Sequence, residues 1–129
     1  MADIKNLKRQ RTATPDVDGN NLLVLVQGDH MRTTVCYFGA SIPSGGHVTT
    51  EQWDHFVNSH IVQRIGSFTL SETVGYWKGS RERTYVLTVI HSKDDDISGD
   101  VAIIAELYKK EFKQEAVLIN TQKTSPILI

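Results

Sequence analysis

The feature that most restricts how this chain can fold is the order of two hydrophobic periodicities after Thr33. Segments with the two-residue period of β-strands alternate with segments whose apolar residues recur at the spacing of an amphipathic helix. From Thr33 to Thr121 the order is strand, helix, strand, strand, helix, strand. This order predicts an α+β fold in which both helices bury an apolar stripe against one sheet.

The first predicted helix has clear signals at both ends. Thr49 is a suitable N-cap, and Gln52, three residues later, completes a capping box. Gly66 is placed to end the helix. The apolar stripe between these ends consists of Trp53, Phe56, Val57 and Ile61. Its spacing of i, i+3, i+4 and i+8 predicts a helix that packs on a sheet.

The second predicted helix begins near Ser98 and follows a charged loop, Asp94 to Asp96. Its apolar residues are Val101, Ile104, Ala105, Tyr108 and Phe112. They recur at helical spacing, so the sequence predicts that Tyr108 points into the core.

Four strands are predicted around these helices, over residues 33–42, 68–76, 85–91 and 116–121. The middle two form a hairpin whose turn is predicted over Lys78 to Arg83. Glu72 interrupts an otherwise apolar strand face, and Gly75 is predicted to mark a β-bulge.

These elements together predict a ferredoxin-like β-α-β-β-α-β sandwich, with an antiparallel sheet covered by two helices on one face. The apolar run Leu22 to Val26 predicts an extra N-terminal strand. The predicted domain organisation is a flexible N-terminal arm over residues 1–21, one α+β domain over 22–121 and an apolar C-terminal tail over 122–129.

Charge and composition disfavour several classes of partner. Lys plus Arg is 14 and Asp plus Glu is 15, which leaves no general excess of positive charge for nucleic acid or an anionic membrane. Nucleic-acid binding through the basic arm and Arg81/Arg83 stays as a minor alternative. No apolar run approaches the roughly 20 residues of a membrane span. The N-terminus has no hydrophobic signal region and Cys36 is the single cysteine, so the sequence predicts a cytoplasmic protein.

One stretch of the sequence resembles a known bacterial family. Tyr37-Phe38-Gly39-Ala40-Ser41-Ile42-Pro43-Ser44-Gly45-Gly46, with Val48-Thr49 and then Trp53 and Phe56, is similar to the family called domain of unknown function 3574. Arg64, Gly75-Tyr76-Trp77 and the segment from Tyr108 to Val117 extend the resemblance over roughly Thr33 to Ile119. The family typically has Pro-Arg-Phe where this chain has Gln63-Arg64-Ile65. The resemblance implies an α+β fold and carries no established activity.

The loop before the first helix is the first candidate ligand site. Two glycines precede a helix N-terminus, a geometry that attracts anions such as phosphate or carboxylate. The candidate ligand-binding residues are Ser44, Gly45, Gly46, His47 and Thr49. The alternative is a strand-to-helix turn closed by the capping box.

The hairpin is the second candidate site. Trp77 is followed closely by Arg81 and Arg83, and cations beside aromatic rings suit an anionic or aromatic ligand. An ordinary charged turn explains the same residues.

Candidates for catalysis are few. The candidates for acid–base chemistry in a pocket are Glu72, Tyr37 and His91. Glu72 stands out because a carboxylate in an apolar setting has a raised pKa. Tyr76 and Trp77 complete the set to test. Histidine and cysteine spacing matches no metal motif, so neither a metal nor another cofactor is predicted. Cys36 lies in an apolar strand and is interpreted as an inert thiol.

The sequence therefore favours a non-catalytic binding or interaction module of unknown specificity. Its predicted partners are a second copy in a homodimer, a small anionic ligand or another protein. The alternative is a small enzyme of the dimeric α/β-barrel type, with a pocket between the sheet and the helices.

Overall fold

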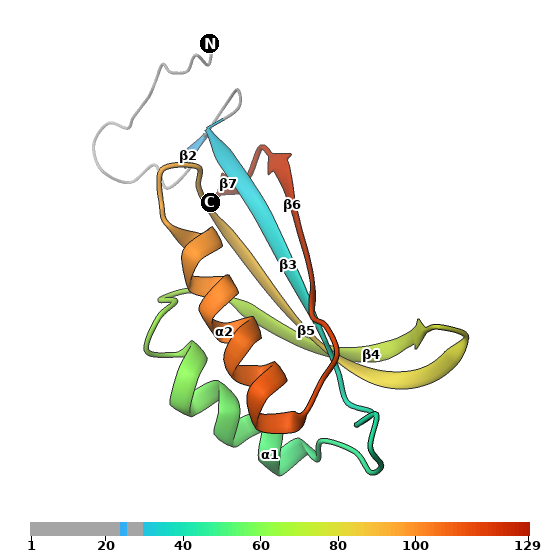
Figure 1. The fold of residues 1–129 in the computed structure, drawn as a ribbon. Coiled ribbons are helices and arrows are strands. Elements are labelled where there is room, and N and C mark those ends of the chain that lie inside the picture. The colour runs from blue at the N-terminus through green and yellow to red at the C-terminus, as the bar shows by residue number, and fades with distance from the viewer. Residues whose placement is uncertain (1–23, 26–29) are drawn as a thin grey trace. The chain divides into compact units, whose positions relative to one another are not determined.

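The computed structural model describes residues 24–25 and 30–129 (Figure 1). The described chain separates into two compact units. One unit comprises Thr34–Val89 and Asp96–Asn120, and it holds both helices. The described parts of the other are residues 24–25, 30–33, 90–95 and 121–129. The predicted arm over residues 1–21 lies outside the described residues.

A four-stranded antiparallel sheet organises the fold. Its strand order is β4-β5-β3-β6, and the chain runs β3, α1, β4, β5, α2, β6. The strands are β3 (Met31–Gly39), β4 (Thr69–Trp77), β5 (Ser80–Ser92) and β6 (Leu118–Thr124). The helices are α1 (Thr50–Phe56), which continues as the π-helical turn η1 (Val57–Ile61), and α2 (Ile97–Phe112). The predicted α+β class, with four antiparallel strands and two helices, is confirmed.

The extra N-terminal strand exists, but it does not join this sheet. β2 (Val24–Leu25) pairs antiparallel with β7 (Ile127–Leu128) in a separate two-stranded sheet. The register places Val24 opposite Leu128. The apolar tail is therefore a partner of the chain's own N-terminal strand.

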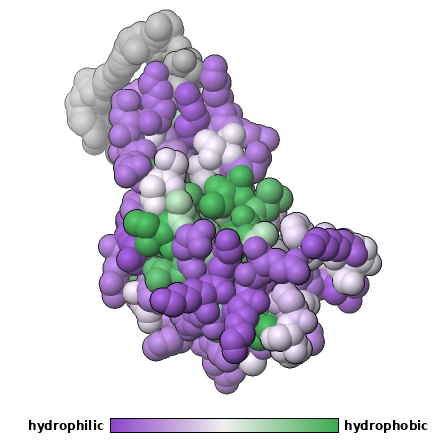
Figure 2. All heavy atoms as spheres, in the orientation of Figure 1, coloured by the Kyte–Doolittle hydropathy of each residue, from purple (hydrophilic) through white to green (hydrophobic). Residues whose placement is uncertain are grey.

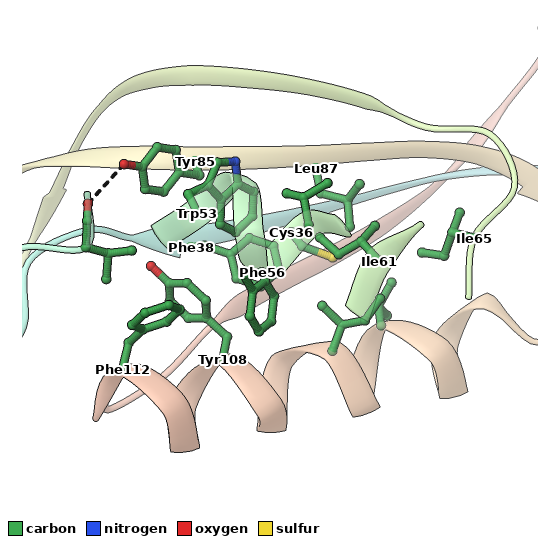
Figure 3. Packing of buried hydrophobic residues seen from close by; sticks show 14 of the residues in the cluster. Cys36, Phe38, Trp53, Phe56, Ile61, Ile65, Tyr85, Leu87, Tyr108 and Phe112 are labelled. Carbon is green, nitrogen blue, oxygen red and sulfur yellow. Dashed lines mark hydrogen bonds between the residues drawn. The ribbon is translucent and has the colours of Figure 1, made fainter. Parts of the chain in front are cut away.

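Aromatic side chains fill the space between the four-stranded sheet and the helices (Figure 3). Trp53 stacks on Tyr85 with a centroid distance of 4.7 Å, and Phe38 packs against Trp53 at 5.1 Å. Tyr108 is fully buried and contacts Phe38 edge-on at 4.9 Å. The inward orientation predicted for Trp53 and Tyr108 is confirmed. Neither of the two hollows described below is lined by a residue of this core.

Two buried hydroxyl groups have acceptors within this core. The Tyr85 hydroxyl donates to the Val48 carbonyl at 3.0 Å, the dashed line in Figure 3. The Tyr108 hydroxyl donates to the Gly39 carbonyl at 2.6 Å. Buried hydroxyls that have acceptors avoid the cost of an unsatisfied polar group.

The helix start signals work as predicted at α1 and are offset at α2. The Thr49 side chain accepts from the Gln52 N–H, and the Gln52 side chain accepts from the Thr49 N–H, which completes the capping box. At α2 the N-cap is Asp96, whose carboxylate accepts from the Gly99 N–H. The helix begins at Ile97, one residue before the predicted start.

Two local predictions in the hairpin are wrong. The turn spans Lys78 and Gly79 alone, because both have positive φ and suit a tight two-residue hairpin turn. Arg81 and Arg83 therefore lie within β5. The β4–β5 ladder is continuous through Gly75, which faces Glu82 without a bulge.

Among the described helices, none combines the length and the apolar composition that a membrane span requires.

Candidate functional site

One concave site is a pocket of about 410 Å³ on the unit formed by Thr34–Val89 and Asp96–Asn120. We call it the sheet pocket. Its lining residues come from β3, the β4–β5 hairpin and the segment that leads from α2 into β6: Tyr37, Gly39, Ser41, Pro43, Gly75, Tyr76, Trp77, Lys78, Ser80, Glu82, Thr84, Gln114, Glu115, Ala116 and Leu118.

Strand alternation places this pocket on the sheet face that the helices leave open. Successive side chains of a strand point to opposite faces. Phe38 and Tyr85 lie in the core beneath the helices. Their strand neighbours Tyr37, Gly39 and Thr84 therefore point the other way, and all three line the pocket.

Aromatic rings on β3 and β4 line the sheet pocket. Tyr37 is 38% exposed and Trp77 is 46% exposed. The Trp77 indole N–H donates to Glu115 Oε1 at 3.3 Å, and Lys78 Nζ contacts the same oxygen at 3.3 Å. These hydrogen bonds, that of Trp77 foremost, lower the pKa of Glu115. The pairing holds the Trp77 ring at the edge of the pocket.

Glu82 brings a carboxylate into the same pocket. The side chain is partly buried, and its Oε1 accepts from the Ser41 backbone N–H at 3.0 Å. Gly39 leaves room for it, since a Cβ atom there would lie 2.6 Å from Glu82 Oε2. On the neighbouring strand Gly75 leaves similar room for the Thr84 hydroxyl, which a Cβ atom would approach to 2.7 Å. The two glycines keep this part of the sheet open.

A second, wider hollow lies along the β4–β5 hairpin and includes His47, Glu72, Arg81, Glu82 and Arg83. Arg83 Nε forms an ion pair with Glu72 Oε2 at 3.2 Å, and Arg83 Nη2 donates to the Val48 carbonyl at 3.3 Å. The predicted odd carboxylate, Glu72, is thus the partner of an arginine on the neighbouring strand.

The glycine loop has an internal hydrogen-bond pattern. The Gly45 N–H donates to the Ile42 carbonyl at 2.8 Å, and the Ile42 N–H donates to the Gly46 carbonyl at 3.0 Å. Gly45 and Gly46 both have positive φ, which explains why glycine occurs at these positions. Ser44 is exposed in this turn, and Thr49 caps α1. None of these residues lines the sheet pocket.

The three catalytic candidates are not brought together. Tyr37 lines the sheet pocket, while Glu72 lies in the hairpin hollow. His91 belongs to the other compact unit, where it is buried and its Nδ1 lies 2.9 Å from the Ser92 carbonyl oxygen. Trp77 is the one predicted ligand-binding residue that lines the sheet pocket.

Nucleophilic and metal chemistry have little support among the described residues. Cys36 is fully buried, and this burial raises the pKa of its thiol to about 12. A neutral thiol is a poor nucleophile. The described residues contain no group of three or more histidine, cysteine, aspartate or glutamate side chains placed to hold a metal ion.

Sequence reasoning missed the polar residues of the sheet pocket, Ser41, Glu82, Gln114 and Glu115. Gln114 Nε2 donates to the Ser41 carbonyl at 2.9 Å across 73 positions of sequence. A weak sequence signal existed for Glu82, which stands between two arginines in a strand. Because successive side chains of a strand point to opposite faces, Glu82 lies on the face opposite to both arginines.

Comparison with known proteins identifies the family. Residues 33–126 match the family described as "Protein of unknown function (DUF3574)". The chain belongs to this family. The resemblance inferred from the stretch that begins at Tyr37 is therefore confirmed. The part of the chain that matches DUF3574 contains every residue that lines the sheet pocket. No curated protein matches this sequence.

Solved structures show what the DUF3574 chain is similar to in fold. A phage SAM lyase in complex with S-methyl-5'-thioadenosine has a TM-score of 0.58 and 16% identity, with 78% of this chain and 90% of that chain covered. A phage SAM lyase in the apo state has a TM-score of 0.53 and 17% identity, with the same coverage of both chains. CutA from Synechococcus elongatus PCC7942 has a TM-score of 0.46 and 8% identity, over 82% of this chain and 85% of that chain.

Proposed function

We propose that this protein is a small-molecule-binding domain and that the sheet pocket is its binding site. The observation that carries the proposal is the meeting of aromatic rings with several polar side chains in one concave site of about 410 Å³. Binding sites for small molecules are mostly apolar clefts of roughly 300–1,000 Å³ with a few convergent polar groups. The sheet pocket has this composition.

An adenosine thioether is the first ligand to test. Its flat purine suits stacking on Trp77, and its ribose hydroxyls suit the Glu82 carboxylate and the Gln114 amide as hydrogen-bond partners. The fold likeness to a phage SAM lyase that holds S-methyl-5'-thioadenosine supports this choice. Carboxylates outnumber cations in the pocket, so a neutral or positively charged ligand is favoured there over an anionic one.

Isothermal titration calorimetry with S-methyl-5'-thioadenosine tests the proposal. We expect saturable binding, weakened about tenfold in Trp77→Leu because loss of a stacking ring costs roughly 1–3 kcal/mol. Ile103→Ala removes a side chain of similar exposure from α2 and serves as the matched control. Absence of binding, or equal loss in both variants, would contradict the site.

A lyase activity is the second candidate, and the fold likeness to a phage SAM lyase is the observation that favours it. It keeps the enzyme alternative but moves the pocket to the open face of the sheet. The test is chromatographic detection of S-methyl-5'-thioadenosine after incubation with S-adenosylmethionine. If S-adenosylmethionine stays unchanged while S-methyl-5'-thioadenosine binds tightly, the protein binds the ligand but is not a lyase.

We further propose that the chain has the ferredoxin-like topology and associates with a second copy. The element order and the strand order β4-β5-β3-β6 support the first statement. Exposed apolar residues support the second, and Figure 2 shows hydrophobic surface gathered among hydrophilic side chains on the visible face. Tyr37, Trp77 and Leu118 line the open face of the sheet, and each is at least 38% exposed.

A further inference from the structure

The sheet pocket contains one acidic side chain whose charge no cation balances among the described residues. We propose that Glu82 is the counter-ion for a sulfonium group of the ligand, carried on an apolar or aromatic body. This inference rests on the proposed function, because it assigns the ligand class of the same pocket.

Glu82 is held in position from two sides. Its Oε1 accepts from the Ser41 N–H at 3.0 Å, and the absence of a side chain at Gly39 leaves room for Oε2 against β3. Because the side chain is partly buried and oriented, binding a cation does not require it to be ordered first.

Of the carboxylates that line the sheet pocket and the hairpin hollow, Glu115 and Glu72 have cationic partners among the described residues, but Glu82 does not. Glu115 pairs with Lys78 at 3.3 Å, and Glu72 pairs with Arg83 at 3.2 Å. Arg81 and Arg83 border the hairpin hollow together with Glu82, but their register opposite Tyr76 and Val74 places them on the other strand face. The charge of Glu82 is therefore available to a ligand.

Aromatic side chains beside this carboxylate favour the same ligand class. Tyr37 and Trp77 line the pocket with Glu82, and both rings are partly exposed. The face of an aromatic ring attracts cations, and quaternary ammonium groups are recognised in this way. A carboxylate together with aromatic rings selects a bulky, weakly hydrated cation over both a small metal ion and an anion.

The experiment compares two ligands that differ in charge at one atom. S-adenosylmethionine carries a methyl sulfonium, and S-adenosylhomocysteine has an uncharged thioether sulfur and the same amino-acid group. By calorimetry we expect wild-type protein to bind the sulfonium about tenfold more tightly, a difference that corresponds to roughly 1.4 kcal/mol. Glu82→Gln should reduce this preference to less than about twofold while it still binds the thioether.

Glu106→Gln is the matched control, because it removes an ion-paired carboxylate that does not line the sheet pocket. It should keep the preference. Gly39→Ala gives a second variant, in which the new Cβ displaces the Glu82 carboxylate, and it should lose the preference as Glu82→Gln does.

The outcomes separate the two proposals. Equal affinity of wild-type protein for both ligands would overturn the cation inference and leave the binding function standing. An unchanged preference in Glu82→Gln, or an equal loss in Glu106→Gln, would overturn the role of Glu82. Binding of neither ligand, nor of S-methyl-5'-thioadenosine, would overturn the binding site itself and this inference with it.

Discussion

Cys36 shows how strongly the core acts on a single residue. The side chain is fully buried, and burial raises its thiol pKa from 9.0 to about 12. In the unfolded chain the thiol ionises near its ordinary pKa, whereas in the folded chain it stays neutral. A group whose pKa is raised by folding contributes stability that is present below the unfolded pKa and is lost as the pH rises toward the folded pKa.

The free energy of unfolding should therefore fall between about pH 8 and pH 10, and Cys36→Ala should reduce that slope. Urea unfolding followed by circular dichroism at several pH values measures it. The measurement ends at pH 10, near the ordinary tyrosine pKa of 10.0. Burial also raises the pKa of Tyr108, so at higher pH the ionisation of this tyrosine in the unfolded chain would lower the free energy of unfolding as well. The cavity left in Cys36→Ala lowers stability equally at every pH. An unchanged slope in the variant would show that the thiol is not the titrating group.

The β4–β5 hairpin is the element whose geometry depends most on its turn. Gly79 has φ of 81°, and nothing lies within 4 Å of a Cβ atom built there. An L-residue in the left-handed region costs roughly 1–2 kcal/mol, so Gly79→Ala should destabilise the protein by about that amount. Thermal unfolding of the purified variant is the measurement.

Gly66→Ala is the control for this prediction. Gly66 also has open space around it, but its φ lies outside the left-handed region. Alanine there should be neutral or stabilising by up to about 1 kcal/mol, because it reduces the conformational freedom of the unfolded chain. Equal destabilisation of both variants would mean that loss of a glycine, and not the turn conformation, is responsible.

Self-association is a property of the whole molecule. Leu118 is 61% exposed on the open sheet face, where the proposed second copy would cover it. Light scattering at high micromolar concentration should give a mass above that of one 14.5 kDa chain. Leu118→Arg should shift the protein toward monomer, because a buried unpaired charge is costly. Ile103→Arg, on α2, should leave the mass unchanged. A monomeric wild-type protein would overturn the proposed association.

Local sequence signals determined the class of fold and the inward faces of the helices. The capping box at Thr49 and the stripe from Trp53 to Ile61 involve residues a few positions apart, so their geometry follows from helix periodicity. The same is true of Tyr108 and its neighbours on α2. Where neighbouring residues decide the structure, the sequence alone is sufficient to predict it.

Only the tertiary structure decided which residues form the sheet pocket. Ser41, Glu82 and Gln114 are far apart in the sequence and meet because β5 lies beside β3 and because the chain leaves α2 next to β3. The hairpin turn shows the same limit: the sequence predicted a turn over residues 78–83, but pairing with β4 extends β5 back to Ser80. Strand pairing joins distant residues, and the turn at Lys78 and Gly79 sets the register in which β5 pairs with β4.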